Sequence, residues 1–433
     1  MDINLTIPFQ FPLIGHNPWD SDFLEERHDF WDSPTTFRWF EARGYTLYRR
    51  MCLGEHDIMN PFTVPRLPTE DSVDAEYPYP YHDNYTSNQD YIYSALDTSG
   101  KVVFAQDVHG RHVAIKLVPN NTDELRILQL LSQQSLKVLE ANCLIPVLEF
   151  LPIKGFCFVV MPRWGASPAV PSPGTLREVV QIMRSMLKAL SFLHEHNIIH
   201  RDISMRNLLV NHFASEYNVH GNPSRAKLRS AGLLSYALFD FDISVMVPPT
   251  VAKSDFRLPY RMSWDGSYNQ PFDTAQGEFD YDPFAFDVGT MGREFCRHYQ
   301  HAAKNLSLLA PLLDGMTTRN IPRRFTASGA LEFLEARLSE VPDKHLQQPF
   351  LAASQTGMYD RYDRWQHVPP DFAQKWAMYR EPRLPVMTRF LRWLCSFEAM
   401  AHVIPFIRRT LSSIWATPYQ FIASVGRRRR VML

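Results

Sequence analysis

The stretch HRDISMRN at 200–207 decides the fold of this chain. Upstream of it, apolar residues recur at spacings of three or four from Val180 to Leu193, a pattern that predicts an amphipathic helix leading into the stretch. Downstream of it, the run NLLV is typical of a short strand. We therefore expect a loop between two regular elements that presents the carboxylate of Asp202 and the amide of Asn207.

The region before this helix is β-rich. The runs YIYSAL at 91–96, KVVFAQDV at 101–108 and HVAIKLV at 112–118 are separated by Gly100 and Gly110, which predicts antiparallel strands joined by turns. The third run ends close to Lys116, and Glu124 begins a helix-like apolar pattern. Alone, such a lysine is usually a surface residue and such a glutamate a solvated one. Their order before the loop favours an ion pair.

These motifs, with FDFD at 239–242, resemble the eukaryotic protein kinase superfamily over roughly residues 88–342. The resemblance implies an α+β, bilobal kinase-like fold, with a small antiparallel β-rich lobe at about 88–163 and a larger helical lobe at about 164–342. An aromatic and proline-rich extension precedes it at 1–87, and a C-terminal extension ending in a basic tail follows at 343–433. The runs FWDSPTTFRWFEARGY, MPRW and YDPFAFDVGTMG resemble divergent kinase-like proteins of mushroom-forming fungi.

The same resemblance implies Mg²⁺-dependent transfer of the γ-phosphoryl group of ATP to a hydroxyl of a protein substrate. Lys116 would contact the ATP phosphates, Glu124 would orient Lys116, and Asp202 would be the catalytic base. Asn207 and Asp240 would hold Mg²⁺. The resemblance further assigns Arg201 to the catalytic loop, Gly100, Ala114 and Met161 to the nucleotide site, and His200, Asp287 and Arg324 to structural positions.

For two of these structural positions the sequence leaves an alternative open. Asp287, in FDVGTMG, would accept hydrogen bonds from the catalytic-loop backbone, but it could instead cap a helix. Arg324 would anchor the segment that follows FDFD, or it could be an exposed arginine. The nearest candidate partner for Arg324 is Glu278, although the residues around Glu278 do not match the family's motif.

Departures from the family pattern bear on activity. ALDTSG at 95–100 keeps only Gly100 of the phosphate-covering glycines, and Asp242 replaces the glycine of DFG. In the phosphate-covering loop, a side chain limits how closely backbone N–H groups approach the phosphates, and a carboxylate repels their charge, so we expect weaker nucleotide binding. Ser204 stands where serine/threonine kinases have lysine, and Arg206 where tyrosine kinases have arginine, so the hydroxyl class is open, with Ser/Thr favoured. Polar residues around 218–230 predict a surface loop.

Three functions are compatible with these motifs. An active protein kinase is favoured because every charged catalytic position is present. A pseudokinase that binds partners with weak or no turnover is the alternative that the altered glycine positions suggest. A small-molecule phosphotransferase of the aminoglycoside or choline kinase type shares the HxDxxxxN loop, but Arg201, Asp287 and Arg324 argue against it.

Composition narrows the partners and the compartment. Lys+Arg 45 against Asp+Glu 46 leaves no overall basic field, so nucleic acid is not an expected partner. The five scattered cysteines form no CxxC pair, and no signal peptide or transmembrane run is present, so we expect an intracellular protein, cytoplasmic or nuclear. The basic, aromatic segment from Arg389 could contact a membrane surface, but we expect Pro405 and Pro418 to interrupt it, which favours packing on the protein or disorder.

Overall fold

The computed structural model describes residues 5–8, 21–51, 62–83, 95–96, 100–215, 222–352 and 362–411. The chain divides into two compact units. The first comprises Met1–Ile198, Ser204–Met246 and Leu334–Ser354, and the second comprises Ile199–Ile203, Val247–Phe333 and Gln355–Leu433.

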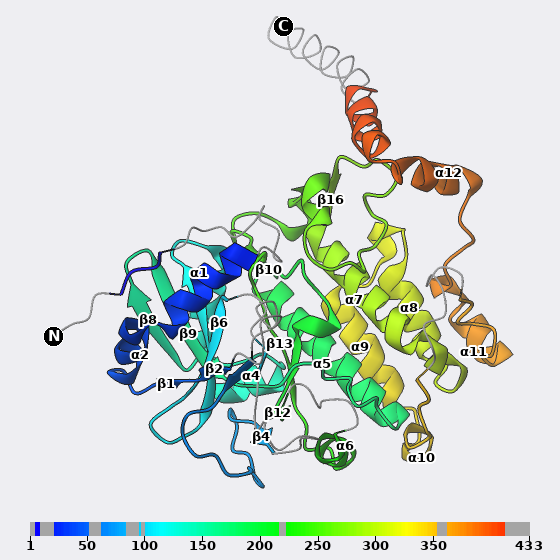
Figure 1. The fold of residues 1–433 in the computed structure, drawn as a ribbon. Helices are drawn as coiled ribbons and strands as arrows, with labels where there is room; N and C mark the ends of the chain where they lie inside the picture. Colours follow the sequence, from blue (N-terminus) through cyan, green and yellow to red (C-terminus); the bar gives the residue numbers. More distant parts are fainter. Residues whose placement is uncertain are drawn as a thin grey trace, which may run out of the picture. The chain divides into compact units, whose positions relative to one another are not determined.

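A five-stranded antiparallel sheet is the main β-structure of the first unit (Figure 1). Its strands follow in the order β1 (Thr46–Leu47), β6 (Val102–Gln106), β7 (His112–Pro119), β9 (Phe156–Pro162) and β8 (Glu149–Ile153). β6 and β7 form the hairpin predicted around Gly110, with Val102 opposite Lys116. Of the first predicted run, Ala95–Leu96 form β5, which pairs with β3 (Phe62–Val64), and β3 pairs with β2 (Arg49–Met51). Residues 91–94 lie outside the described residues.

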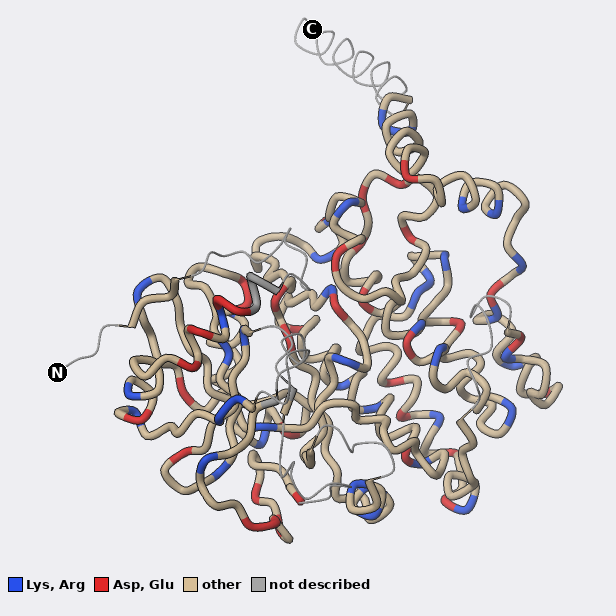
Figure 2. Tube along the Cα trace, in the orientation of Figure 1, with Lys and Arg blue, Asp and Glu red and all other residues tan. Residues whose placement is uncertain are grey.

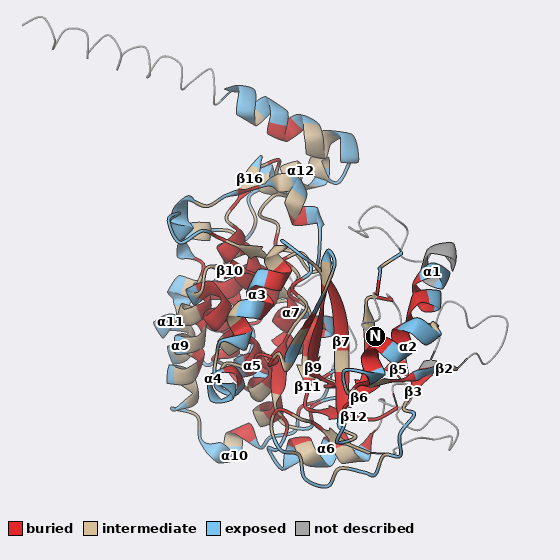
Figure 3. Cartoon of the chain, turned by 90° about the vertical axis from the view of Figure 1, so that its left-hand side faces the viewer, coloured by how far each residue is buried: buried red, intermediate tan, exposed pale blue. Residues whose placement is uncertain are grey.

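Two N-terminal helices pack their aromatic residues against this sheet. Ser33 caps α2 (Pro34–Glu41) by accepting a hydrogen bond from the Thr36 N–H, so α2 begins directly after α1 (Ser21–Asp32). Trp31, Trp39 and Phe40 surround Phe158 of β9, with ring centroids 5.0 to 5.7 Å from it. These rings belong to one buried cluster that includes residues of β6 and β7, and Figure 3 shows the buried colour along these strands. Residues before 88 thus complete the core of the sheet, and the predicted boundary at 87/88 stays a prediction.

Helices follow the sheet in the first unit. The helix predicted over 180–193 is part of α5 (Leu176–Glu195), which Thr175 caps. α3 (Asp123–Ser132) and α4 (Leu136–Ala141) precede it, and α10 (Asp343–Leu346) follows late in the chain. The short strands are β4 (Tyr81–His82) with β12 (His212–Phe213), β11 (Leu208–Val210) with β13 (Tyr236–Leu238), β10 (Ile198–Ile199) and β14 (Val245–Met246).

The prediction of a surface loop around 218–230 is wrong for residues 223–230. Residues 218–221 lie outside the described residues, but Pro223–Ser230 form the helix α6, which Asn222 caps. Arg225 and Arg229 of this helix are almost fully buried. Their guanidinium groups donate hydrogen bonds to backbone carbonyls of the Pro-rich loop at 166–171. Polar composition misled the prediction because arginine can be buried when carbonyls satisfy its donors.

In the second unit, α7 (Pro283–Tyr299) and α8 (Leu309–Thr317) lie side by side (Figure 1). Their contact depends on Gly292, where a Cβ atom would come within 2.8 Å of the Met316 Cβ. β15 (Leu258–Pro259) pairs with β16 (Asp280–Tyr281) before α7. α9 (Ala327–Leu338) begins in this unit, and its residues from Leu334 on belong to the first unit. α11 (Pro370–Lys375), α12 (Val386–Cys395) and a helix over 398–411 follow in the second unit.

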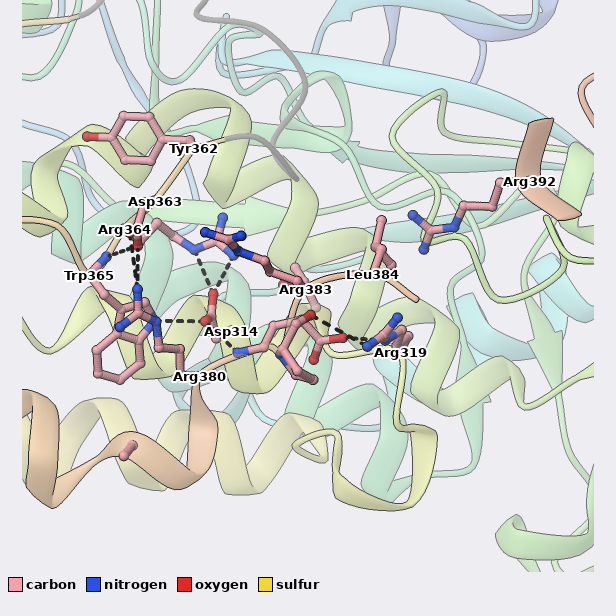
Figure 4. A pocket seen from close by; sticks show the side chains of 14 residues that line it. Asp314, Arg319, Tyr362, Asp363, Arg364, Trp365, Arg380, Arg383, Leu384 and Arg392 are labelled. Atoms are coloured by element: carbon pink, nitrogen blue, oxygen red, sulfur yellow. Dashed lines mark hydrogen bonds and ion pairs between the residues drawn. The ribbon is translucent and has the colours of Figure 1, made fainter. Parts of the chain in front are cut away.

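Part of the C-terminal extension is anchored on α8 of this unit. Asp314 accepts hydrogen bonds from the Arg364 guanidinium, from the Trp365 indole at 2.8 Å and from the Glu381 N–H at 3.0 Å (Figure 4). Arg364 also donates to the side-chain oxygen of Gln300. Both charges of this ion pair are buried, so residues 364–381 are held by a satisfied polar network. The predicted boundary at 342/343 stays a prediction.

The expected α+β kinase-like class, with a small antiparallel sheet followed by a larger helical region, is confirmed. Within the described residues, no helix has the length and apolar character needed to cross a bilayer.

Candidate active site

Lys116 lies between two carboxylates in the first unit. β7 holds the lysine backbone, and Thr122 caps α3 so that Glu124 falls in the first helical turn. The Lys116 ammonium forms ion pairs with Glu124 Oε1 and, at 2.8 Å, with Asp240 Oδ1. Glu124 is 4% exposed and Asp240 is 34% exposed, so the aspartate is the partner that solvent can reach.

The charge of Lys116 is fixed by these neighbours. Burial alone would lower the pKa of Lys116, but the carboxylates of Asp240, Glu124 and Asp242 raise it above its ordinary value. The ammonium group therefore stays protonated at neutral pH. A buried cation with an exposed carboxylate beside it can bind a polyphosphate and its metal ion.

Asn207 and Asp240 lie at the same end of a two-stranded ladder. β11 follows Asn207, β13 precedes Asp240, and Leu208 is opposite Leu238. The Phe239 N–H donates to the Asn207 carbonyl at 3.1 Å. Asp240 has φ 68°, a left-handed conformation that non-glycine residues rarely adopt outside functional sites. Amide and carboxylate oxygens suit Mg²⁺, which usually takes few protein ligands and completes its shell with phosphate and water.

The remaining nucleotide-site candidates lie on the sheet and beside α1. Ala114 of β7 and Met161 of β9 are opposite each other in the register. Gly100 has φ 61°, its carbonyl accepts a hydrogen bond from the Trp31 indole at 2.8 Å, and a Cβ atom there would lie 2.8 Å from the side chain of Arg27. α1 therefore contacts the one glycine that this loop retains. Asp97, at the second altered glycine position, lies outside the described residues.

Asp242, which replaces the glycine of DFG, forms an ion pair with Lys101. Lys101 Nζ lies 2.6 Å from Asp242 Oδ2, and the two side chains are 19% and 42% exposed. Lys101 is not among the residues that the sequence predicts for the site. The available signal was a cation directly after Gly100 in a chain that carries an extra carboxylate after FDF. This pair offsets part of the negative charge that Asp242 brings near Lys116.

In the second unit, Asp287 of α7 holds the backbone of HRD. Its carboxylate accepts hydrogen bonds from the His200 N–H at 2.7 Å and the Arg201 N–H at 2.9 Å. Asp282, not Asp287, caps α7, so the capping alternative for Asp287 is wrong. The Asp202 N–H donates to His200 Nδ1 at 3.2 Å. This contact is the one that the family resemblance implies for Asp287, and its importance for activity stays a proposal.

The guanidinium of Arg201 is held within the same unit. Arg201 has φ 68° and donates to the Met262 carbonyl at 2.7 Å and to Asp265 Oδ2 at 3.0 Å. Arg201 thus links the HRD loop to the chain around 262–265.

Arg324 is anchored by Asp273, and the suggested Glu278 partner is wrong. The two terminal nitrogens of Arg324 each lie 2.7 Å from one Asp273 oxygen, and they also donate to the Ala285 and Thr318 carbonyls. The side chains of Arg324 and Asp273 are 1% and 6% exposed, so the exposed-arginine alternative is also wrong. Glu278 instead pairs with Arg408. The planar guanidinium matches a carboxylate at two points, which no spacing rule in this segment reveals.

Comparison with known proteins covers part of this site, from Gly100 to Asn207, and ends before Asp240. Residues 98–237 match the family model described as protein tyrosine and serine/threonine kinase. Serine/threonine-protein kinase PLK4 of Drosophila virilis is 29% identical over a match that covers 22% of this chain and 17% of that protein. The resemblance to fungal kinase-like proteins is not addressed by either match and stays a prediction.

Proposed function

Because this chain belongs to the eukaryotic protein kinase superfamily, we propose that it transfers the γ-phosphoryl group of ATP to a serine or threonine hydroxyl of a protein substrate. The observation that supports this most directly is the buried Lys116 ammonium paired with Glu124 and Asp240. Kinase chemistry needs these charges because positioning and electrostatic stabilisation supply most of the rate.

In this proposal each charged residue has a separate task. Lys116 binds the α- and β-phosphates and Glu124 fixes its orientation. Asn207 and Asp240 would hold Mg²⁺, which neutralises charge on the β- and γ-phosphates when bound. Asp202 accepts the proton of the substrate hydroxyl as its oxygen bonds to the γ-phosphorus, while the bond from that phosphorus to the β–γ bridging oxygen breaks and ADP leaves.

The serine/threonine class rests on less direct support. The related PLK4 is a serine/threonine-protein kinase by name. Ser204, at the position where such kinases have a lysine, accepts a hydrogen bond from the Arg206 N–H at 3.0 Å and caps the turn at Met205–Asn207. Its side chain is thus engaged in the loop, and Arg206 is exposed beside it. A tyrosine-directed activity is the outcome that would change this assignment.

The test is transfer of labelled phosphate from Mg-ATP to the chain itself and to a degenerate peptide library with Ser, Thr or Tyr acceptors. We expect Asp202→Asn to lower the rate at least about 100-fold, because it removes the proton acceptor. Asp363→Asn, at a surface ion pair, is the matched control and should keep the parent rate. Undiminished transfer by Asp202→Asn would contradict the proposal.

A pseudokinase is the second candidate, and it is favoured by Asp242 at the position of the DFG glycine. A carboxylate at the DFG glycine position, together with Ala95 at the first glycine position, disfavours close approach of phosphates. Such a protein would bind a partner with weak or no turnover. Measurable phosphotransfer that depends on Asp202 excludes this candidate.

A further inference from the structure

The C-terminal helices carry a row of exposed apolar side chains. On α12 and just after it, Val386, Met387, Phe390, Trp393 and Phe397 recur at helical spacing, and Val403, Phe406, Ile407 and Leu411 continue on the helix over 398–411. We call these nine residues the C-terminal apolar stripe, and they are between 43% and 73% exposed. The Trp393 ring contacts the rings of Phe390 and Phe397. Exposed apolar side chains gathered in this number mark an interaction site.

The opposite side of the helix over 398–411 is attached to the second unit. Ile404 is buried against Gly277, His402 hydrogen-bonds the Tyr260 hydroxyl at 2.7 Å, and Arg408 pairs with Glu278 at 3.1 Å. The helix runs through Pro405 without a break, so the expected interruption at this proline is wrong. Attachment on one side and exposure on the other leave the stripe facing solvent.

Basic residues accompany the stripe. Residues 386–411 contain Arg389, Arg392, Arg408 and Arg409 but only one acidic residue, Glu398. Figure 2 shows basic positions along α12. Residues 412–433 lie outside the described residues, and their sequence adds RRRR at 427–430 and no acidic residue. Apolar and aromatic side chains flanked by arginine are the pattern of helices that lie in the plane of an anionic membrane surface.

We propose that the C-terminal apolar stripe inserts into the interface of an anionic lipid bilayer and attaches this chain peripherally to it. The charge distinguishes this occupant from a second copy of the chain. A symmetric dimer through the stripe would bring two arginine-rich surfaces together, which like-charge repulsion disfavours. Anionic headgroups can instead neutralise the exposed Arg389 of α12 while the acyl region takes up the aromatic rings.

Sedimentation of the full chain with vesicles tests the proposal. We compare neutral phosphatidylcholine vesicles with vesicles that also contain phosphatidylserine. The parent chain should bind the anionic vesicles and lose binding as salt rises. The double variant Phe390→Ser, Trp393→Ser should bind at least about tenfold more weakly. Tyr268→Ser, at an exposed aromatic residue elsewhere in the same unit, is the matched control and should bind like the parent.

The role of charge is tested separately. Arg389→Glu should weaken binding to the anionic vesicles, whereas the control Lys154→Glu, in the exposed turn between β8 and β9, should leave it unchanged. The substituted side chains are exposed, and unchanged melting temperatures show that the variants fold. Equal binding to neutral vesicles, or full binding by the double variant, would overturn the proposal. So would a concentration-dependent dimer that the double variant abolishes, because it assigns the stripe to a second copy.

Discussion

We expect Asp273→Ala to lower the free energy of unfolding of the second unit more than a substitution at a surface ion pair does. The change removes two charge-assisted hydrogen bonds of 2.7 Å and leaves the Arg324 guanidinium, which is 1% exposed, without its carboxylate. The Ala285 and Thr318 carbonyls remain as acceptors but carry no charge. Breaking a buried ion pair on one side costs about 3–5 kcal/mol, and we expect a loss in this range.

Urea unfolding of the parent and the variant measures this loss as a change in the free energy of unfolding. Asp363→Asn is the matched control, because it keeps an oxygen that can accept the Trp365 N–H hydrogen bond and removes only the charge of the exposed pair with Arg380. Such exposed pairs contribute about 0–1 kcal/mol. The double variant Asp273→Leu, Arg324→Met should recover much of the loss because it leaves no buried charge. A loss below about 1 kcal/mol for Asp273→Ala would refute the reasoning that this pair anchors the segment before α7.

Three further predictions concern the first unit. Burial lowers the pKa of His82 from 6.5 to about 4, so neutral His82 contributes its full stabilisation above pH 6.5. Between pH 6.5 and pH 4 the free energy of unfolding should fall by about 1.4 kcal/mol per pH unit, and His82→Phe should reduce this slope in unfolding experiments. Asp242→Gly should tighten Mg-ATP binding about tenfold in a titration, and unchanged affinity would show that Lys101 already cancels its charge. Trp31→Phe should cost about 1–2 kcal/mol in urea unfolding because the buried Gly100 carbonyl loses its donor, and a neutral result would contradict this hydrogen bond.

Residue type and order were enough to predict the charged groups of the candidate site. Lys116, Glu124 and Asp240 stand in three separate motifs, yet the structure brings their side chains together. Binding of phosphate and metal requires specific charges at fixed points of the fold, so residues of this kind can be recognised from their type and order in the sequence. The hairpin around Gly110 and the helix before the HRD loop were predictable for a similar reason, since periodicity and turn residues are local signals.

Long-range partners could not be predicted in this way. The carboxylate opposite Arg324 comes from Asp273, 51 positions away, and no local pattern distinguishes it from Glu278. The polar composition around Arg225 predicts a loop, because composition does not show that its guanidinium can be buried against backbone carbonyls near residue 166. Trp31 reaches Gly100 across 69 positions for the same reason. Each of these contacts depends on how distant segments pack.

The most direct test of the account is the melting temperature of the chain with and without Mg-ATP, measured beside Asp240→Asn. A ligand that binds only the folded state stabilises it, by about 2.7 kcal/mol at one hundred times its dissociation constant. We predict a clear rise in the melting temperature of the parent, and loss of that rise in the variant, because Asp240 is the solvent-accessible partner of Lys116. No rise at millimolar nucleotide, or an equal rise in both proteins, would contradict a working Mg-ATP site at these residues.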